Sequence, residues 1–224
     1  MCGRVTVQTP AIEIAREFAL AGIRNAIDRP RFNLAPTQLM PVVANDGQRM
    51  LDAYRWGLIP SWAKDASIGS KLINARSETV AEKPSFRSAL KRRRCLLLID
   101  GYYEWKQTTK PKTPFFFHRK DRKPFALAGL WEEWTSPETG EVVRTCSLLT
   151  TGPNALIAPI HDRMPVILSP AGQQQWLRPE PVEAAELQPL LVSCPDDFLD
   201  AYEVARVVNS PTNDVPECIE RVAA

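Results

Sequence analysis

The apolar and polar positions of this chain predict many short elements rather than a few long ones. Residues 9–20 repeat apolar side chains with a helical period, and Thr9 and Pro10 are expected as the N-cap and the first helical residue. Two more short helices are expected at 83–91 and 169–177, each with a proline near its start. Runs rich in apolar, β-branched and aromatic side chains predict strands at 40–44, 50–56, 95–100, 114–118, 125–131 and 143–150.

The order of these elements favours an α+β fold. Strands outnumber helices and do not alternate with them regularly, unlike the pattern of a doubly wound parallel sheet. The 20 prolines are scattered along the 224 residues, which implies many loops, and no segment is long enough to be a linker. Since 44% of the residues are hydrophobic, one sizeable core can form. We therefore expect residues 1–224 to form a single domain.

The cysteine and histidine content argues against several classes of site. The five cysteines are an odd, widely spaced set without a C-x-x-C pair, which disfavours a disulfide framework or a zinc site. The two histidines, His118 and His161, are a poor metal site, so no metal and no cofactor are expected. The chain shows no signal-like segment and lacks the roughly 20 consecutive apolar residues of a membrane span. We expect a cytoplasmic monomer with no membrane partner.

Charge is distributed unevenly along the chain, although the net charge is only +2. Residues 178–224 carry 3 of the 28 Lys and Arg side chains and 10 of the 26 Asp and Glu side chains, so residues 1–177 have a net charge of +9. A basic body with an acidic C-terminal segment suggests an anionic partner. Trp56, Trp62 and Trp105 lie among Arg and Lys residues, which suits single-stranded nucleic acid, although Trp56 and Trp62 could equally be core side chains.

The stretch MCGR places a cysteine where removal of Met1 would leave it at the N-terminus. Cys2 would then carry a free α-amine and a thiol two carbons apart, with reference pKa values of about 7.7–8.0 and about 8.5. Gly3 lets the backbone approach a ligand closely, and Arg4 supplies a fixed positive charge. From its position alone, Cys2 could also be a small core residue.

Three further stretches combine one polar side chain with apolar or aromatic neighbours. Asn74 in LINARSET could orient a polar substrate group, or it could be a turn residue. Glu104 in IDGYYEWK follows a predicted strand and a glycine turn. Its aromatic neighbours would desolvate the carboxyl group and raise its pKa toward neutrality, which suits a general acid or base, unless Glu104 is a surface charge. His161 in IHDRMP is a fourth candidate, or else a structural histidine, and each signal is weak alone.

Several longer segments occur in the order found in one known family. They are MCGR, RFNLAPTQ, RWGLIPSWAKD, INARSETVAEKPSFR, RRRCLLLIDGYYEWK, PFALAGLWEEW and IHDRMPVIL, followed by VVNSPTNDVPECIE. Together they cover roughly residues 2–220 and resemble the SOS-response-associated peptidase (SRAP) family, whose members react with abasic sites in DNA. Phe32 stands where a tyrosine is common. The resemblance implies a single α+β domain with a barrel-like mixed β core flanked by short helices, and a positively charged cleft that holds single-stranded DNA.

The resemblance also assigns roles to individual residues. The family's nucleophile falls on Cys2, and its other catalytic residues fall on Asn74, Glu104 and His161. The side chains that would contact DNA or shape the cleft are Arg4, Asn33, Pro36, Trp62, Arg76 and Arg163.

The implied chemistry explains why a cysteine would be needed at position 2. The α-amine of Cys2 attacks the ring-opened aldehyde of an abasic deoxyribose, and the thiol then closes on the same carbon to give a thiazolidine. The product is a covalent DNA–protein crosslink that shields the lesion, in the context of DNA repair and the SOS response. Glu104 would shuttle protons, His161 would assist opening of the sugar ring, and Asn74 would position the N-terminus or the sugar. The peptidase name would refer to removal of Met1, and the crosslinking would be single-turnover, with lyase-like chemistry as an option.

Two other functions stay open from the residues alone. A Cys–Gly N-terminus also begins glutamine amidotransferases of the N-terminal-nucleophile type, although no other segment resembles their glutamine-binding motifs. A non-covalent module that binds single-stranded DNA, in which Cys2 is idle, would also fit the charge pattern.

Overall fold

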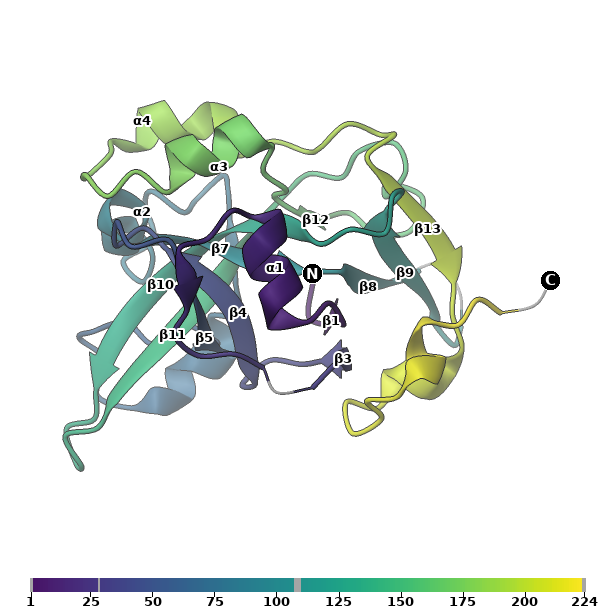
Figure 1. The fold of residues 1–224 in the computed structure, drawn as a ribbon, viewed down its shortest axis with the longest axis horizontal. Helices are drawn as coiled ribbons and strands as arrows, with labels where there is room; N and C mark the ends of the chain where they lie inside the picture. Colours follow the sequence, from purple (N-terminus) through teal and green to yellow (C-terminus); the bar gives the residue numbers. More distant parts are fainter. Residues whose placement is uncertain (1, 28, 107–109, 223–224) are drawn as a thin grey trace.

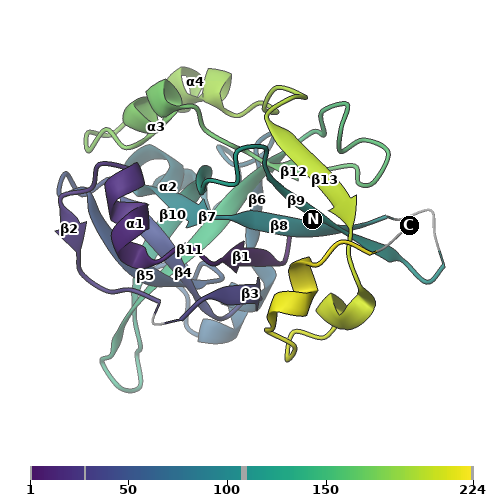
Figure 2. The same ribbon diagram turned by 45° about the vertical axis from the view of Figure 1, so that its right-hand side comes forward.

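The computed structural model describes residues 2–27, 29–106 and 110–222, which form two β-sheets and a few short helices (Figures 1 and 2). The first sheet has five strands in the order β13-β9-β8-β1-β3, and all neighbours are antiparallel. Its strands are β1 (Val5–Val7), β3 (Arg31–Leu34), β8 (Gly101–Lys106), β9 (Thr113–Arg119) and β13 (Leu199–Glu203).

The second sheet closes on itself as a barrel. Its strand order is β12-β11-β10-β7-β4-β5-β2, and a parallel pairing of β5 with β11 joins the ring, while β6 pairs with β11 in parallel. Its strands are β2 (Gly22–Ile23), β4 (Leu39–Ala44), β5 (Met50–Trp56), β6 (Asn74–Arg76), β7 (Arg94–Ile99), β10 (Phe125–Thr135), β11 (Val142–Thr151) and β12 (Met164–Pro165). The predicted single-domain α+β fold with a barrel-like mixed β core is thereby confirmed.

The helices of the described residues are all short and lie outside the barrel. They are α1 (Ala11–Glu17), α2 (Arg87–Arg92), α3 (Pro170–Trp176) and α4 (Ala184–Leu187), with 3₁₀ turns at 66–71, 188–190, 206–209 and 216–219. In both views α3 and α4 lie together at one end of the barrel, and the β10–β11 hairpin projects at the other (Figures 1 and 2). The larger apolar core fills the barrel, and a smaller one packs the 3₁₀ turns of residues 206–219 against β8, β9 and β13.

All six predicted strands are present, and the predicted strand 50–56 coincides with β5. The prediction of Thr9 as an N-cap is wrong, because α1 begins at Ala11 with Pro10 at the cap position. The Thr9 N–H and Oγ1 groups donate instead to the Asp100 carboxylate, at 2.9 and 2.5 Å. Asp100 lies between β7 and β8, so this contact ties the start of α1 to the point where the chain leaves the barrel.

The first residue of β8, Gly101, must be glycine because a side chain would not fit at this position. A Cβ atom at this position would lie 2.4 Å from the Phe116 ring and 2.6 Å from the Phe117 carbonyl oxygen. The chain passes from β7 into β8 with only Asp100 between the two strands. Glu104 consequently lies within a strand, whereas the sequence pattern predicted a glycine turn before it.

Candidate active site

Cys2 lies at the start of β1, where the chain enters the first sheet. Val5 pairs with Tyr102 of β8, and the Tyr103 N–H donates to the Arg4 carbonyl at 3.0 Å, so residues before Arg4 run alongside the second half of β8. The Cys2 side chain is fully buried. Burial, together with the nearby Glu104 carboxylate, raises the pKa of the Cys2 thiol well above its usual range. The thiol is therefore neutral near pH 7 and needs a base before it can act as a nucleophile.

Asn74 holds the backbone of Cys2. It is the first residue of β6, which pairs with β11 in parallel, and its Nδ2 group donates to the Cys2 carbonyl at 2.8 Å. Its Oδ1 atom is buried and has no hydrogen-bond partner among the described residues. Asn74 is thus a strand residue rather than a turn residue, and it keeps one acceptor available next to Cys2.

Glu104 is a buried carboxyl group, with only 2% of its surface exposed. Burial raises its pKa to about 7, in agreement with the desolvation expected from its aromatic neighbours. The alternative that Glu104 is a surface charge is therefore wrong. Since the acid and its conjugate base are both populated near neutral pH, this group can donate and accept protons in one reaction cycle.

His161 faces Glu104 from the loop that precedes β12. The His161 Nε2 and Glu104 Oε2 atoms are 3.5 Å apart. The Arg163 N–H donates to His161 Nδ1 at 3.1 Å, and burial lowers the pKa of the imidazole. In the neutral ring this hydrogen bond assigns the proton to Nε2, on the side of Glu104. The exposed Asp162 carboxylate, 3.0 Å from Nδ1, would favour the doubly protonated ring.

The structure therefore brings all four predicted catalytic residues together, although they come from four separate places in the chain. Asn74 contacts the Cys2 backbone, Glu104 contacts His161, and the Glu104 charge acts on the Cys2 thiol. Tyr102, which the sequence reasoning did not single out, shares a face of β8 with Glu104 because it lies two residues earlier. Its hydroxyl group is buried and has no hydrogen-bond partner among the described residues.

Two of the predicted DNA contacts have exposed side chains. Arg76 is exposed at the end of β6, two residues after Asn74. Trp62 is 60% exposed, whereas Trp56 is fully buried and donates its Nε1–H to the Ile73 carbonyl at 2.9 Å. Trp56 is thus a core residue, whereas the Trp62 side chain is open to solvent.

The polar groups of Arg4 and Asn33 are occupied by contacts within the protein. The Arg4 guanidinium donates to Asn33 Oδ1 at 2.7 Å and to the Val208 carbonyl at 2.9 Å, and it lies 5.8 Å from the centre of the Trp105 ring. The Asn33 Nδ2 group also reaches Val208, at 3.1 Å. These two residues attach the C-terminal segment to β1 and β3. Their assignment as DNA contacts stays a prediction.

Arg163 and Pro36 complete the predicted set. Arg163 makes a two-pronged ion pair with Glu78, at 2.6 and 2.9 Å, and also donates to the Thr150 carbonyl at 2.6 Å. Pro36 is half-buried in the connection between β3 and β4. Glu78 was not predicted, because nothing in the sequence links it to a residue 85 positions later.

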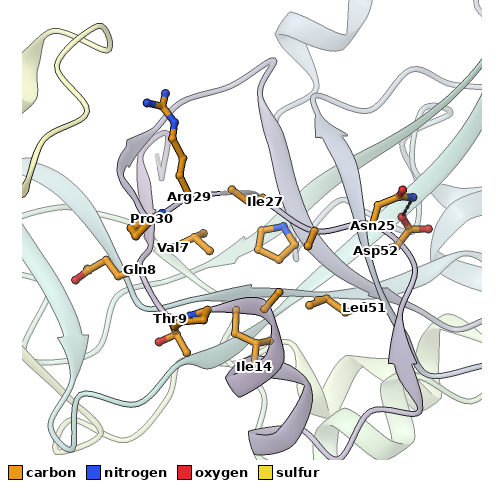
Figure 3. Close-up of a pocket in the computed structure, with 14 residues that line it drawn as sticks. Val7, Gln8, Thr9, Ile14, Asn25, Ile27, Arg29, Pro30, Leu51 and Asp52 are labelled. Atoms are coloured by element: carbon orange, nitrogen blue, oxygen red, sulfur yellow. Dashed lines mark hydrogen bonds between the residues drawn. The ribbon is translucent and has the colours of Figure 1, made fainter.

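A separate cavity of about 230 Å³ lies between α1, the end of β1 and residues 25–27, 29 and 30 (Figure 3). Its walls are mainly apolar, from side chains such as Val7, Ile14 and Leu51, and at one end Asn25 donates to Asp52 at 2.6 Å. None of the predicted catalytic residues lines it, so this cavity is not part of the candidate active site.

Residues 2–27, 29–106 and 110–222 lack the features of two other kinds of site. In that part of the chain, no helix is both long and apolar enough to cross a membrane. Within the same ranges, no three His, Cys, Asp or Glu side chains gather in a way that could hold a metal ion.

The chain is similar in sequence and in fold to known proteins. The family model for the SOS response associated peptidase (SRAP) matches residues 1–211. The abasic site processing protein YoqW of Bacillus subtilis is 44% identical over 98% of this chain and 99% of its own. The abasic site processing protein HMCES of Gallus gallus is 30% identical over 98% of this chain and 77% of its own. A crystal structure of a protein from Bacteroides thetaiotaomicron superposes with a TM-score of 0.88 and 28% identity, covering 99% of this chain and all of the other. The chain therefore belongs to the SOS response associated peptidase family.

Proposed function

We propose that this protein reacts with abasic sites in single-stranded DNA and forms a covalent thiazolidine through Cys2 once Met1 has been removed. The observation that carries the proposal is the buried cluster in which Asn74 holds the Cys2 backbone and a carboxyl group of pKa about 7 acts on the Cys2 thiol. The names of the relatives, which refer to abasic site processing, support the choice of substrate.

The reaction starts with the α-amine of Cys2. Its nitrogen attacks the aldehyde carbon of the ring-opened sugar, a C–N bond forms, and loss of water gives a protonated imine whose nitrogen keeps one proton. The departing oxygen must be protonated, which protonated Glu104 can do. Because the pKa of Glu104 is about 7, a large fraction of the molecules carries this proton at neutral pH.

Ring closure uses the thiol of the same residue. The sulfur adds to the carbon of the protonated imine, a C–S bond forms, the thiol proton passes to a base, and the ring nitrogen keeps its own proton. The raised pKa of the Cys2 thiol makes spontaneous ionisation unfavourable, so the closing step needs a base. Glu104, left as a carboxylate after the first step, can take the thiol proton because its charge acts on the Cys2 thiol, and taking this proton restores its protonated first state.

His161 and Asn74 prepare the two reactants. The neutral His161 imidazole can move a proton between the anomeric hydroxyl group and the ring oxygen of the sugar, which opens the ring to the aldehyde. The unpaired Asn74 Oδ1 atom can accept an N–H of the Cys2 α-amine and so orient its lone pair. Removal of Met1 is required in this scheme, because only then is the amine free. A second part of the proposal is that the same cluster removes Met1, as the family name suggests.

In this proposal the DNA strand contacts Arg76 and Trp62. Arg76 can neutralise a phosphate next to the lesion, and the exposed Trp62 ring can stack on a base or wedge against one. The net charge of +9 in residues 1–177 supports an electrostatic contribution to binding. We further propose that the protein acts as a monomer.

The test uses a single-stranded oligonucleotide with one abasic site and a denaturing gel. The processed protein is expected to give a shifted covalent band, the Cys2→Ala variant none, and a Cys95→Ala variant, which lacks another fully buried cysteine, the same band as the wild type. Glutaminase activity without a shifted band would indicate an amidotransferase instead. Binding in a native gel without any covalent band would indicate a non-covalent module.

A further inference from the structure

Residues 154–161 form two consecutive turns that end at His161. The Ile157 and Ala158 N–H groups donate to the Asn154 carbonyl at 3.2 and 3.0 Å. The Ile160 and His161 N–H groups then donate to the Ile157 carbonyl at 2.8 and 2.9 Å. The position of the imidazole therefore depends on where this pair of turns begins, which is at Asn154.

The Asn154 side chain uses both of its polar atoms to hold that beginning. It is 7% exposed, and its Oδ1 atom accepts the Ile157 N–H at 3.1 Å, which caps the first turn. Its Nδ2 group donates to the Cys194 carbonyl at 3.2 Å and reaches the Pro195 carbonyl at 3.4 Å. A serine or aspartate side chain could cap the turn, but neither has an N–H group to donate to the Cys194 and Pro195 carbonyls, a contact that we call the tether. Only an amide side chain can form the cap and the tether together.

The tether connects the turns to a segment about 40 residues away in sequence. The Ala155 N–H also donates to Asp196 Oδ1 at 2.8 Å, next to the Asn154 contacts. Residues 154–161 are thereby fixed to residues 194–196, which lead into β13 of the first sheet. Because Glu104 belongs to β8 of the same sheet, this tether sets the position of His161 relative to Glu104.

We infer that Asn154 is a positioning residue for His161, holding the imidazole against Glu104 by capping its turn and tethering it to residues 194–196. The inference rests on the proposed function for the role of His161 in ring opening. Asn154 does not touch the reacting atoms in this scheme. It acts through His161, so its loss should affect the step that needs His161 and spare the steps that do not.

The first test compares two single-stranded substrates in single-turnover crosslinking. One carries a natural abasic site, and the other carries an aliphatic aldehyde that cannot cyclise. Asn154→Ala, and Asn154→Ser, which keeps the cap but not the tether, should crosslink the natural site roughly 10- to 100-fold more slowly and the aldehyde at nearly the wild-type rate. The matched control is Thr151→Val, because Thr151 Oγ1 donates to the Leu191 carbonyl at 3.1 Å and joins the same two regions outside the turns.

A double variant separates positioning from a general structural effect. If Asn154 acts through His161, Asn154→Ser combined with His161→Ala should be no slower on the natural site than His161→Ala alone. Losses that multiply, or an equal loss on both substrates, would overturn the inference. Should Asn154→Ala fail to fold, the serine variant, which retains the helix-cap acceptor, decides the outcome.

The second test does not depend on DNA chemistry. The chain has two histidines, so an NMR titration follows His161 with His118 as an internal reference. The charged groups that act on His161 include the N-terminal amine, Glu104, Asp162 and Lys112, and all remain in the serine variant. Because burial lowers the pKa of His161, loosening the turn should move this pKa back toward its ordinary value of 6.5 and leave His118 unchanged.

Different results would contradict the proposed function and the inference about Asn154. If the wild-type protein forms no covalent product, the proposed function is wrong, and the titration alone decides whether Asn154 positions His161. A folded serine variant with the wild-type His161 titration would overturn the inference, even if crosslinking by the wild-type protein is strong.

Discussion

Replacing Glu104 by Gln should make the protein more stable and less active, and the gain in stability should depend on pH. The Glu104 pKa of about 7, against an ordinary value of 4.5, means that the folded protein holds a proton that the unfolded chain has released between these two pH values. The free energy of unfolding therefore falls as pH rises through this window. Ionising the buried Glu104 carboxyl group costs the folded protein about 3 kcal/mol, at 1.36 kcal/mol per pKa unit, and this full cost is reached above pH 7.

Glutamine has no charge to desolvate, so the variant avoids this cost. We expect Glu104→Gln to raise the free energy of unfolding by about 3 kcal/mol at pH 8 and by about 1 kcal/mol or less at pH 5. Any effect of the amide on packing is the same at both pH values. The difference between the stability changes at pH 8 and pH 5 therefore reports only the ionisation of the carboxyl group. The measurement is urea unfolding of the two proteins at each pH.

Glu203→Gln is the matched control for this experiment. Glu203 is exposed on β13, and its neighbour across the sheet, Phe115, is also the neighbour of Glu104. The control removes the same charge and should change neither the stability profile nor crosslinking. At the same time, Glu104→Gln should slow crosslink formation by about 10²–10⁴-fold. The reasoning would be refuted by a stability difference between variant and wild type that is the same at pH 5 and pH 8.

Three further changes test other parts of the account. Cys2→Ser keeps the amine but loses the better ring-closing nucleophile, so its adduct should be a labile imine that borohydride traps, and a heat-stable adduct would contradict this. Arg76→Glu should lower DNA affinity and crosslink yield together, and wild-type affinity should fall with salt with a log–log slope of roughly −0.7 per contacted phosphate, whereas salt-independent binding would argue against phosphate contacts. Arg4→Met should lower the free energy of unfolding by about 2 kcal/mol, because it removes the donor to the buried Asn33 Oδ1 atom and one of the two donors to the Val208 carbonyl, and unchanged urea unfolding would show that this link is dispensable.

The sequence predicts the barrel better than the strands that carry the site. Strand β5 matches its prediction because residues 50–56 have strong strand composition and clear boundaries. Strand β8 was missed because glycine after Asp100 suggests a turn, whereas Gly101 is required by the close approach of the Phe116 ring. Thr9 was assigned as a cap because no local signal reveals that Asp100, 91 residues later, accepts its hydrogen bonds.

In the candidate active site, short motifs predict which residues matter, whereas contacts between residues distant in sequence decide how they are held. The residue types were predicted from short motifs, and the desolvation of Glu104 was predicted from its aromatic neighbours. Local composition does not predict the contact between Asn74 and Cys2, because it depends on the parallel pairing of β6 with β11; only the family resemblance suggested that Asn74 positions the N-terminus or the sugar. The link from Arg4 to Val208 joins residues 204 positions apart and likewise leaves no trace in local composition.

The central claim is that both new bonds are made by Cys2, and peptide mass spectrometry tests it most directly. The crosslink with an abasic oligonucleotide is digested with nuclease and protease, and the modified peptide is sequenced by fragmentation. The account predicts that the remnant of the sugar lies on an N-terminal peptide beginning with Cys2, with neither a free amine nor a free thiol on that residue. A remnant on a lysine, on another cysteine, or on a chain that still begins with Met1 would contradict it.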